Sequence, residues 1–208
     1  MTTLSTSRDF TVARTAKLAH DQGMTDVRDG VIKTADLLES GVPRYAIETR
    51  CRPGGPWRRL LPGVLLLSPD EPTRRQRLRA ALVYAGPQAV ITGVDALHEQ
   101  GLRTLPLPER VHVLQEADQR RSNHDFLLLE RTTRRPQVVE QTDLALATPS
   151  RAVLDAARRE QHPLRLHLLL ATVLRTGLCT AAELLAELDA GSKRGAAAPR
   201  AALRLLAH

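Results

Sequence analysis

Glycine and proline interrupt residues 33–67 so often that only short elements fit between them. The interruptions are Gly41, Pro43, Pro53, Gly54, Gly55, Pro56, Pro62 and Gly63. Because these residues favour turns and end helices, the pattern between them predicts two short helices, over 33–40 and 44–52. The apolar side chains expected to form a small core between the two helices are Leu37, Leu38, Val42 and Ile47.

A β-hairpin is predicted directly after the second helix. Residues 57–60 and 64–67 are β-prone and flank the turn at Pro62-Gly63. Two short helices joined by a tight turn form a helix-turn-helix, and a hairpin that follows it forms a wing. We therefore expect a winged helix-turn-helix domain over 1–72, which also includes a helix over 8–22.

The remainder, 73–208, has a different pattern. Apolar spacing, helix caps and turn residues predict helices over 74–85, 92–100, 149–159, 163–175, 180–188 and 196–207. Strands are predicted over 110–114, 126–130, 137–140 and 144–147. Strands grouped together and followed by helices favour an α+β domain with a small, mostly antiparallel sheet packed with helices. The whole chain is thus expected to be α+β.

The basic charge is concentrated in one part of the sequence. The chain of 208 residues has a formal net charge of +7. Residues 44–79 contain nine basic and three acidic side chains, whereas 1–43 contain five basic and six acidic ones, and 80–208 contain 16 and 14. A focused basic surface suits a polyanion, because neutralised phosphates release counterions. The expected partner is double-stranded DNA.

The second helix of a helix-turn-helix enters the major groove. On the predicted helix over 44–52, Arg44, Tyr45 and Thr49 are the candidates for base reading, since arginine can grip guanine and threonine can contact several base edges. For Tyr45, a hydrogen bond to phosphate and half-buried packing stay open as alternatives. Glu48 could accept from cytosine, but an ion pair with Arg44 or Arg52 is the favoured interpretation. The candidates for phosphate and wing contacts are Thr34, Arg50, Arg52, Arg58 and Arg59. Thr34 is expected to cap its helix and offer a backbone N–H to phosphate.

Other features have plainer interpretations. Trp57 is expected to anchor the core beneath the hairpin. The run from Arg74 to Arg79 is expected to be the solvated face of a helix, with DNA contact as the alternative. Cys51 and Cys179 lie far apart and match no metal-ligand spacing, so two incidental thiols of a reduced chain are expected.

No catalytic motif is present in the sequence. The seven histidines are scattered, and there is no HExxH, GxSxG, P-loop or GxGxxG pattern. We expect no enzyme activity, no catalytic residues, no metal and no cofactor. The N-terminus lacks the basic and apolar regions of a secretory signal, and no apolar run is long enough to span a bilayer. A cytoplasmic, nucleoid-associated location is expected.

Several segments resemble one known bacterial family. The segment from Gly41 through Trp57-Arg58-Arg59 to Val64 looks like the N-terminal domain of AbiEi-type antitoxins of type IV toxin–antitoxin systems. Thr148-Pro149-Ser150-Arg151 through Leu154-Asp155 to Ala157 resembles the family's TP.R..LD.A motif. The similarity extends over roughly residues 30–190. In physical terms Thr148 or Ser150 can cap this helix, and Arg151 and Asp155, four residues apart, can pair.

The resemblance implies a transcriptional regulator that represses its own promoter, with a second domain that opposes a nucleotidyltransferase-like toxin. A toxin protein is therefore a possible partner. Two alternatives stay open: a protein-interaction module for which DNA binding is secondary, and an architectural DNA-binding protein with little sequence preference. Binding as a homodimer or cooperatively to inverted repeats is a further hypothesis, because helix-turn-helix proteins usually read two half-sites.

Overall fold

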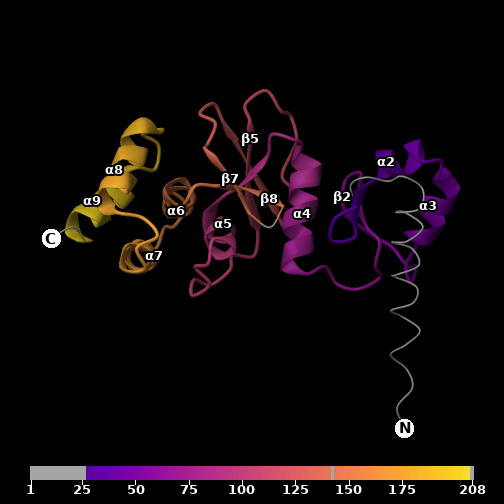
Figure 1. The fold of residues 1–208 in the computed structure, drawn as a ribbon, viewed down its shortest axis with the longest axis horizontal. Helices are drawn as coiled ribbons and strands as arrows, with labels where there is room; N and C mark the ends of the chain where they lie inside the picture. Colours follow the sequence, from indigo (N-terminus) through magenta and orange to yellow (C-terminus); the bar gives the residue numbers. More distant parts are fainter. Residues whose placement is uncertain (1–26, 142, 207–208) are drawn as a thin grey trace, which may run out of the picture. The chain divides into compact units, whose positions relative to one another are not determined.

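The chain is an α+β protein with two compact units (Figure 1). The computed structural model describes residues 27–141 and 143–206, with eight helices and two sheets among them. The helix expected over 8–22 lies outside the described residues. The division falls between Pro87 and Gln88, so that the two units are Met1–Pro87 and Gln88–His208.

Helices α2 and α3 and a three-stranded antiparallel sheet form one part of the first unit. The elements are β1 (Val31–Lys33), α2 (Thr34–Glu39), α3 (Arg44–Arg50), β2 (Arg58–Leu61) and β3 (Val64–Leu66). The strand order is β1-β3-β2. Leu65 of the central strand β3 therefore lies opposite Ile32 of β1 on one side and opposite Arg59 of β2 on the other. The predicted helices and hairpin are therefore present, and β1 is an additional edge strand.

The core of the first unit lies between the two helices and the sheet. Its buried members are Ile32, Leu37, Ile47, Trp57, Leu65 and Leu67, with Val27, Val42 and Cys51 packed against them. Leu37, Val42 and Ile47 are thus core residues, as predicted. The prediction for Leu38 was wrong, because its side chain is 37% exposed. Leu37 and Leu38 point about 100° apart on α2, and only the face that carries Leu37 packs on the core.

Helix α4 (Arg74–Ala85) belongs to the first unit. It begins with a capping box, in which Thr73 and Gln76 each accept a backbone N–H from the other. It contacts β1, β2 and β3. Two of its arginines, Arg75 and Arg79, pair with Asp29 through their Nε atoms at 2.9 and 3.3 Å. These contacts explain why the unit extends past the expected boundary at residue 72.

The second unit contains a five-stranded mixed sheet. Its strands are β4 (Val90–Ile91), β5 (Val111–Glu116), β6 (Leu127–Thr132), β7 (Val138–Gln141) and β8 (Leu144–Ala147). They are arranged in the order β6-β5-β4-β8-β7. The β5–β6 and β4–β8 pairs are parallel, and the β4–β5 and β7–β8 pairs are antiparallel. The expectation of a mostly antiparallel sheet was wrong, because β5 and β6, although consecutive in the sequence, pair in parallel, as do β4 and β8.

The described residues of this unit also form five helices. They are α5 (Gly93–Glu99), α6 (Pro149–Ala157), α7 (Pro163–Arg175), α8 (Ala181–Ala190) and α9 (Ala197–Leu206). Helix α6 contacts α5 on one side and α7 and α8 on the other, as Figure 1 shows. Val153 and Leu154 of α6 are fully buried, so this helix is central to the packing. No helix among the described residues has the length and apolar character needed to cross a membrane.

Candidate nucleic-acid interface

One face of α3 packs on the core and the other is exposed. Ile47 is 2% exposed, and Cys51, just after the helix, packs against the same core. Burial raises the pKa of the Cys51 thiol. The exposed side chains are Arg44, Tyr45, Glu48, Thr49, Arg50 and Arg52. Tyr45 is 71% exposed, so its side chain lies on the surface and is not part of the core.

A tight turn fixes α3 relative to α2. The backbone N–H of Ser40 donates to Asp36, and that of Val42 donates to Leu37 at 3.0 Å. Gly41 has a φ of +89°, a conformation that costs glycine little. Pro43 is the N-cap of α3, and the helix starts at Arg44. This geometry places the side chain of Arg44 at the beginning of the exposed face.

The connection from α3 to β2 leaves no room for a side chain at Gly55. Its N–H donates to the carbonyl of Arg52 at 2.8 Å, and the N–H of Trp57 donates to the carbonyl of Arg50 at 3.0 Å. A Cβ at Gly55 would lie 2.3 Å from the carbonyl oxygen of Arg50. The hairpin is therefore held closely against the end of α3.

Trp57 and Arg50 form a pair at this connection. Trp57 is 5% exposed and belongs to the core, which confirms its predicted role. The guanidinium carbon of Arg50 lies 4.7 Å from the centre of the Trp57 ring. Such a cation–π contact restrains the arginine while leaving its N–H groups available.

The two arginines of β2 differ in their surroundings. The Nε of Arg58 donates to the carbonyl of Pro69 at 2.9 Å, and its Nη1 lies 2.6 Å from a carboxylate oxygen of Glu71. Arg59 is exposed, and its guanidinium has no hydrogen-bond or ion-pair partner among residues 27–141 and 143–206. Successive side chains of a strand point to opposite sides, which explains the difference. Both arginines were expected to contact DNA, but within the described ranges the guanidinium of Arg58 is bound by other residues of the protein, whereas that of Arg59 is not.

A small hollow brings together residues from four parts of the first unit. Thr34, Arg44, Glu48, Arg59 and Gly63 contribute to its lining, and its volume is about 240 Å³. Three of the predicted DNA contacts, Thr34, Arg44 and Arg59, thus lie around one site although they are distant in sequence.

Thr34 does not make the contacts expected of it. Lys33 is the N-cap of α2, and no side chain among the described residues caps this helix. The Thr34 N–H donates to the carbonyl of Gly63 at 2.8 Å, so it is not directed to solvent. The Thr34 hydroxyl oxygen is buried and has no hydrogen-bond partner in the described part of the chain. The prediction of a capping hydroxyl was wrong, because the hairpin turn occupies this end of the helix.

Glu48 does not pair with its helical neighbours. No ion pair joins Glu48 to Arg44 or Arg52 within 4.0 Å, so the favoured interpretation of this residue was wrong. The guanidinium groups of Arg44 and Arg52 are likewise without hydrogen-bond or ion-pair partners among the residues that the structure describes. Exposed ion pairs of this kind stabilise a helix by only about 0.3–0.5 kcal/mol, which the entropy of two long side chains offsets.

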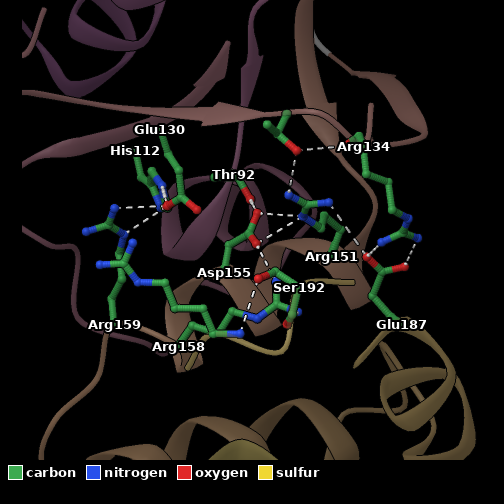
Figure 2. Close-up of polar contacts among 12 residues, drawn as sticks. Thr92, His112, Glu130, Arg134, Arg151, Asp155, Arg158, Arg159, Glu187 and Ser192 are labelled. Carbon is green, nitrogen blue, oxygen red and sulfur yellow. Dashed lines mark hydrogen bonds and ion pairs between the residues drawn. The ribbon is translucent and has the colours of Figure 1, made fainter. Parts of the chain in front are cut away.

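The second unit contains a buried polar cluster that the sequence indicated only in part (Figure 2). Asp155 of α6 is 2% exposed and accepts from the Thr92 hydroxyl at 2.8 Å and from the Nε of Arg151 at 2.9 Å. The predicted i, i+4 pair of Arg151 and Asp155 is confirmed. Arg158 lies 3.4 Å from the same carboxylate. Neither Thr148 nor Ser150 caps α6 through its side chain.

The cluster continues to Glu187 of α8. Arg134 donates to both carboxylate oxygens of Glu187, which raises the pKa of Arg134. Arg151 lies 3.9 Å from the same carboxylate. The cluster thus connects the loop before β7, α6 and α8. Its arginines all have carboxylate partners, and we interpret it as structural.

A separate group joins the sheet to the end of α6. Glu130 of β6 lies 3.1 Å from the Nε2 of His112 and accepts from the Nη2 of Arg159 at 2.9 Å. The hydrogen bond from His112 and the charges of His112 and Arg159 lower the pKa of Glu130 to about 2. No motif in the sequence pointed to this group, because its members come from β5, β6 and the segment after α6.

Comparison with models of protein families gives no match, and neither does comparison with curated proteins. The resemblance to AbiEi-type antitoxins therefore stays a prediction from sequence motifs. Among the described residues, no group of three or more histidine, cysteine, aspartate or glutamate side chains is placed to hold a metal ion.

Proposed function

We propose that the first unit is a winged helix-turn-helix that binds duplex DNA, with α3 in the major groove and the β2–β3 hairpin as the wing. The observation that carries this proposal is a set of exposed arginines without acidic partners in the described ranges: Arg44, Arg52 and Arg59. On α4 of the same unit, by contrast, Arg75 and Arg79 pair with Asp29. Basic side chains without a carboxylate partner are available to phosphates.

Base reading is assigned to the exposed face of α3. Arg44 can donate two hydrogen bonds to guanine, and Thr49 and Tyr45 can contact the edges of neighbouring bases. Glu48, which lacks the expected ion pair, joins these candidates as an acceptor for the amino group of cytosine. Because α3 is held by both the turn before it and the connection after it, these side chains project from a rigid element.

Backbone contacts are assigned to Arg50, Arg52 and Arg59. The stacking of Arg50 on Trp57 restrains its guanidinium at the end of α3. Arg58 is left out, because Glu71 and the Pro69 carbonyl occupy its guanidinium. Thr34 contributes as a wall of the hollow beside Arg44 and Arg59, and not through its backbone N–H.

The role that fits such a protein is a sequence-specific transcriptional regulator, and the sequence resemblance favours an AbiEi-like repressor of its own promoter. In this role a toxin protein would be a partner of the second unit. The resemblance in the Thr148–Ala157 motif is compatible with a structural role, since Arg151 and Asp155 are buried in the polar cluster.

A mobility-shift titration tests the proposal. The full chain is incubated with duplex DNA from upstream of its own coding sequence and with random duplex of equal length, at two salt concentrations. We expect tighter binding to the upstream DNA, lost with Arg44→Ala and retained with Arg58→Ala. Equal affinity for both DNAs would indicate an architectural protein, and the absence of binding to either would refute DNA binding.

A further inference from the structure

The second unit contains an open hollow of about 630 Å³ that the proposed DNA contacts do not use. It is bordered by the start of α5, the segment 105–108, β6 and α7. Sites for small molecules in proteins are concave, mostly apolar and about 300–1,000 Å³ in volume. The hollow has the dimensions of such a site.

Its walls are mainly aliphatic. Six of the lining side chains are Val94, Leu105, Leu107, Leu128, Leu168 and Leu169. Leu107 is 43% exposed and Leu168 is 60% exposed, although most other leucines near α6 and α7 are buried. Apolar side chains that converge on a concave surface can bury the hydrocarbon part of a ligand, at about 25 cal/mol per Å² of area removed from water.

The polar part of the lining is mainly cationic. Arg110, Arg159 and Arg165 contribute to it, whereas Glu160 is the one acidic side chain among the described lining residues. One carboxylate oxygen of Glu160 already accepts the backbone N–H of His162 at 2.8 Å. Since Glu130 neutralises Arg159, the positive charge that favours an anionic ligand comes from the other arginines of the lining.

Arg165 differs from the other two arginines. Arg110 donates to the carbonyl of Leu127, and Arg159 donates to Glu130. The guanidinium of Arg165, an exposed residue in the first turn of α7, has no hydrogen-bond or ion-pair partner among residues 27–141 and 143–206. It lies on the same helix as Leu168 and Leu169, three and four positions later. A positive charge without a counter-ion in the described chain thus borders the aliphatic walls.

We propose that this hollow binds a small amphipathic carboxylate, with its hydrocarbon part among the leucines and its carboxylate on Arg165. Arginine presents a planar donor fork that matches a carboxylate, and this match gives the site its preference for an anion. All lining residues belong to the second unit, so the inference does not depend on DNA binding by the first.

Methyl-detected NMR of the full chain tests the site, with decanoate as the probe and decan-1-ol and decylamine as chain-matched controls. We expect decanoate to shift the methyl signals of Leu107, Leu168 and Val94 in a saturable manner and to bind at least threefold tighter than either control. Arg165→Gln should weaken decanoate binding three- to tenfold, a change equivalent to about 0.7–1.4 kcal/mol. Arg175→Gln, at an exposed arginine of α7 outside the lining, should leave the affinity unchanged.

Three results would overturn the proposal. The first is the absence of saturable shifts at millimolar decanoate. The second is equal or tighter binding of decylamine or decan-1-ol, which would remove the assignment to a carboxylate. The third is equal affinity in Arg165→Gln and Arg175→Gln. Leu168→Asp is a second variant, expected to abolish binding of the decyl chain while changing an exposed side chain that the fold does not need buried.

Discussion

The hydroxyl of Thr92 donates a hydrogen bond to the carboxylate of Asp155, 2.8 Å away, and both side chains are almost completely buried. The contact joins the residue before α5 to α6 across 63 positions of sequence. Since Asp155 also accepts from Arg151 and lies near Arg158, one carboxylate balances two arginines. Loss of the Asp155 carboxylate should therefore destabilise the second unit strongly.

Asp155→Ala is expected to lower the free energy of unfolding by about 3–5 kcal/mol, because it leaves Arg151 buried without its closest counter-ion. Thr92→Val should cost less, about 1–3 kcal/mol, since it removes one hydrogen bond to the carboxylate. Urea denaturation followed by circular dichroism measures both changes. Asp118→Ala, at an exposed residue, is the control and should change stability by less than about 0.5 kcal/mol. Equal stability of Asp155→Ala and Asp118→Ala would contradict the structural role of the cluster.

Gly55→Ala should destabilise the first unit by about 1–3 kcal/mol, because the added Cβ would overlap with the backbone of Arg50. Trp57, the one tryptophan of the chain, lies buried in this unit, so its fluorescence reports the transition directly. Arg52→Ala changes an exposed side chain nearby and should leave the midpoint almost unchanged. If Gly55→Ala unfolded at the same urea concentration as the parent, the inferred close contact between Gly55 and the backbone of Arg50 would be wrong.

Glu130 should make stability depend on pH in the acid range. Its pKa is lowered from 4.5 to about 2, so its contribution is fully present above about pH 5 and is lost as the pH falls towards 2. We expect Glu130→Gln to be less stable than the parent at pH 7, with the difference disappearing between pH 5 and 2. Glu140→Gln, an exposed position of β7, is the control. A difference for Glu130→Gln that stayed constant down to pH 2 would contradict the His112 and Arg159 contacts.

Arg59→Ala and Arg58→Ala form a matched pair on one strand. The Arg59 guanidinium has no partner in the described chain, so Arg59→Ala should weaken binding to all duplexes and reduce the slope of log K against log salt by about one. Arg58→Ala should leave the slope unchanged, because its charge is paired with Glu71. Fluorescence anisotropy over a range of salt concentrations measures both slopes. Equal slopes for the two variants would show that Arg59 does not contact a phosphate.

Local signals predicted most elements of the fold. The turn residues before α3 and after it, and Pro62-Gly63 within the hairpin, determined where the elements of the first unit begin and end. Helices starting at Pro149 and Pro163 also follow from local preference. The two missed strands, β1 and β4, contain only three and two residues, which is too short for an alternating pattern to be recognised.

The partners of individual side chains were harder to predict. The pair of Arg151 and Asp155 follows from the sequence, because a helix places positions i and i+4 together. Thr92 as a third member, and Glu71 as the partner of Arg58, do not follow from it, since these contacts depend on where separate segments meet. The prediction for Glu48 was wrong for a different reason. A helical neighbour was available for an ion pair, but the pair does not form on the exposed face of α3.

Selection from randomised duplex DNA tests the reading of bases by α3 most directly, because the operator sequence does not need to be identified first. The parent protein, Arg44→Ala, Thr49→Ala and Arg59→Ala are each used to enrich bound sequences. We predict one enriched motif for the parent and for Arg59→Ala, with loss of preference at a single position in Arg44→Ala and at another in Thr49→Ala. No enriched motif for the parent, or an identical motif for all four proteins, would contradict the account.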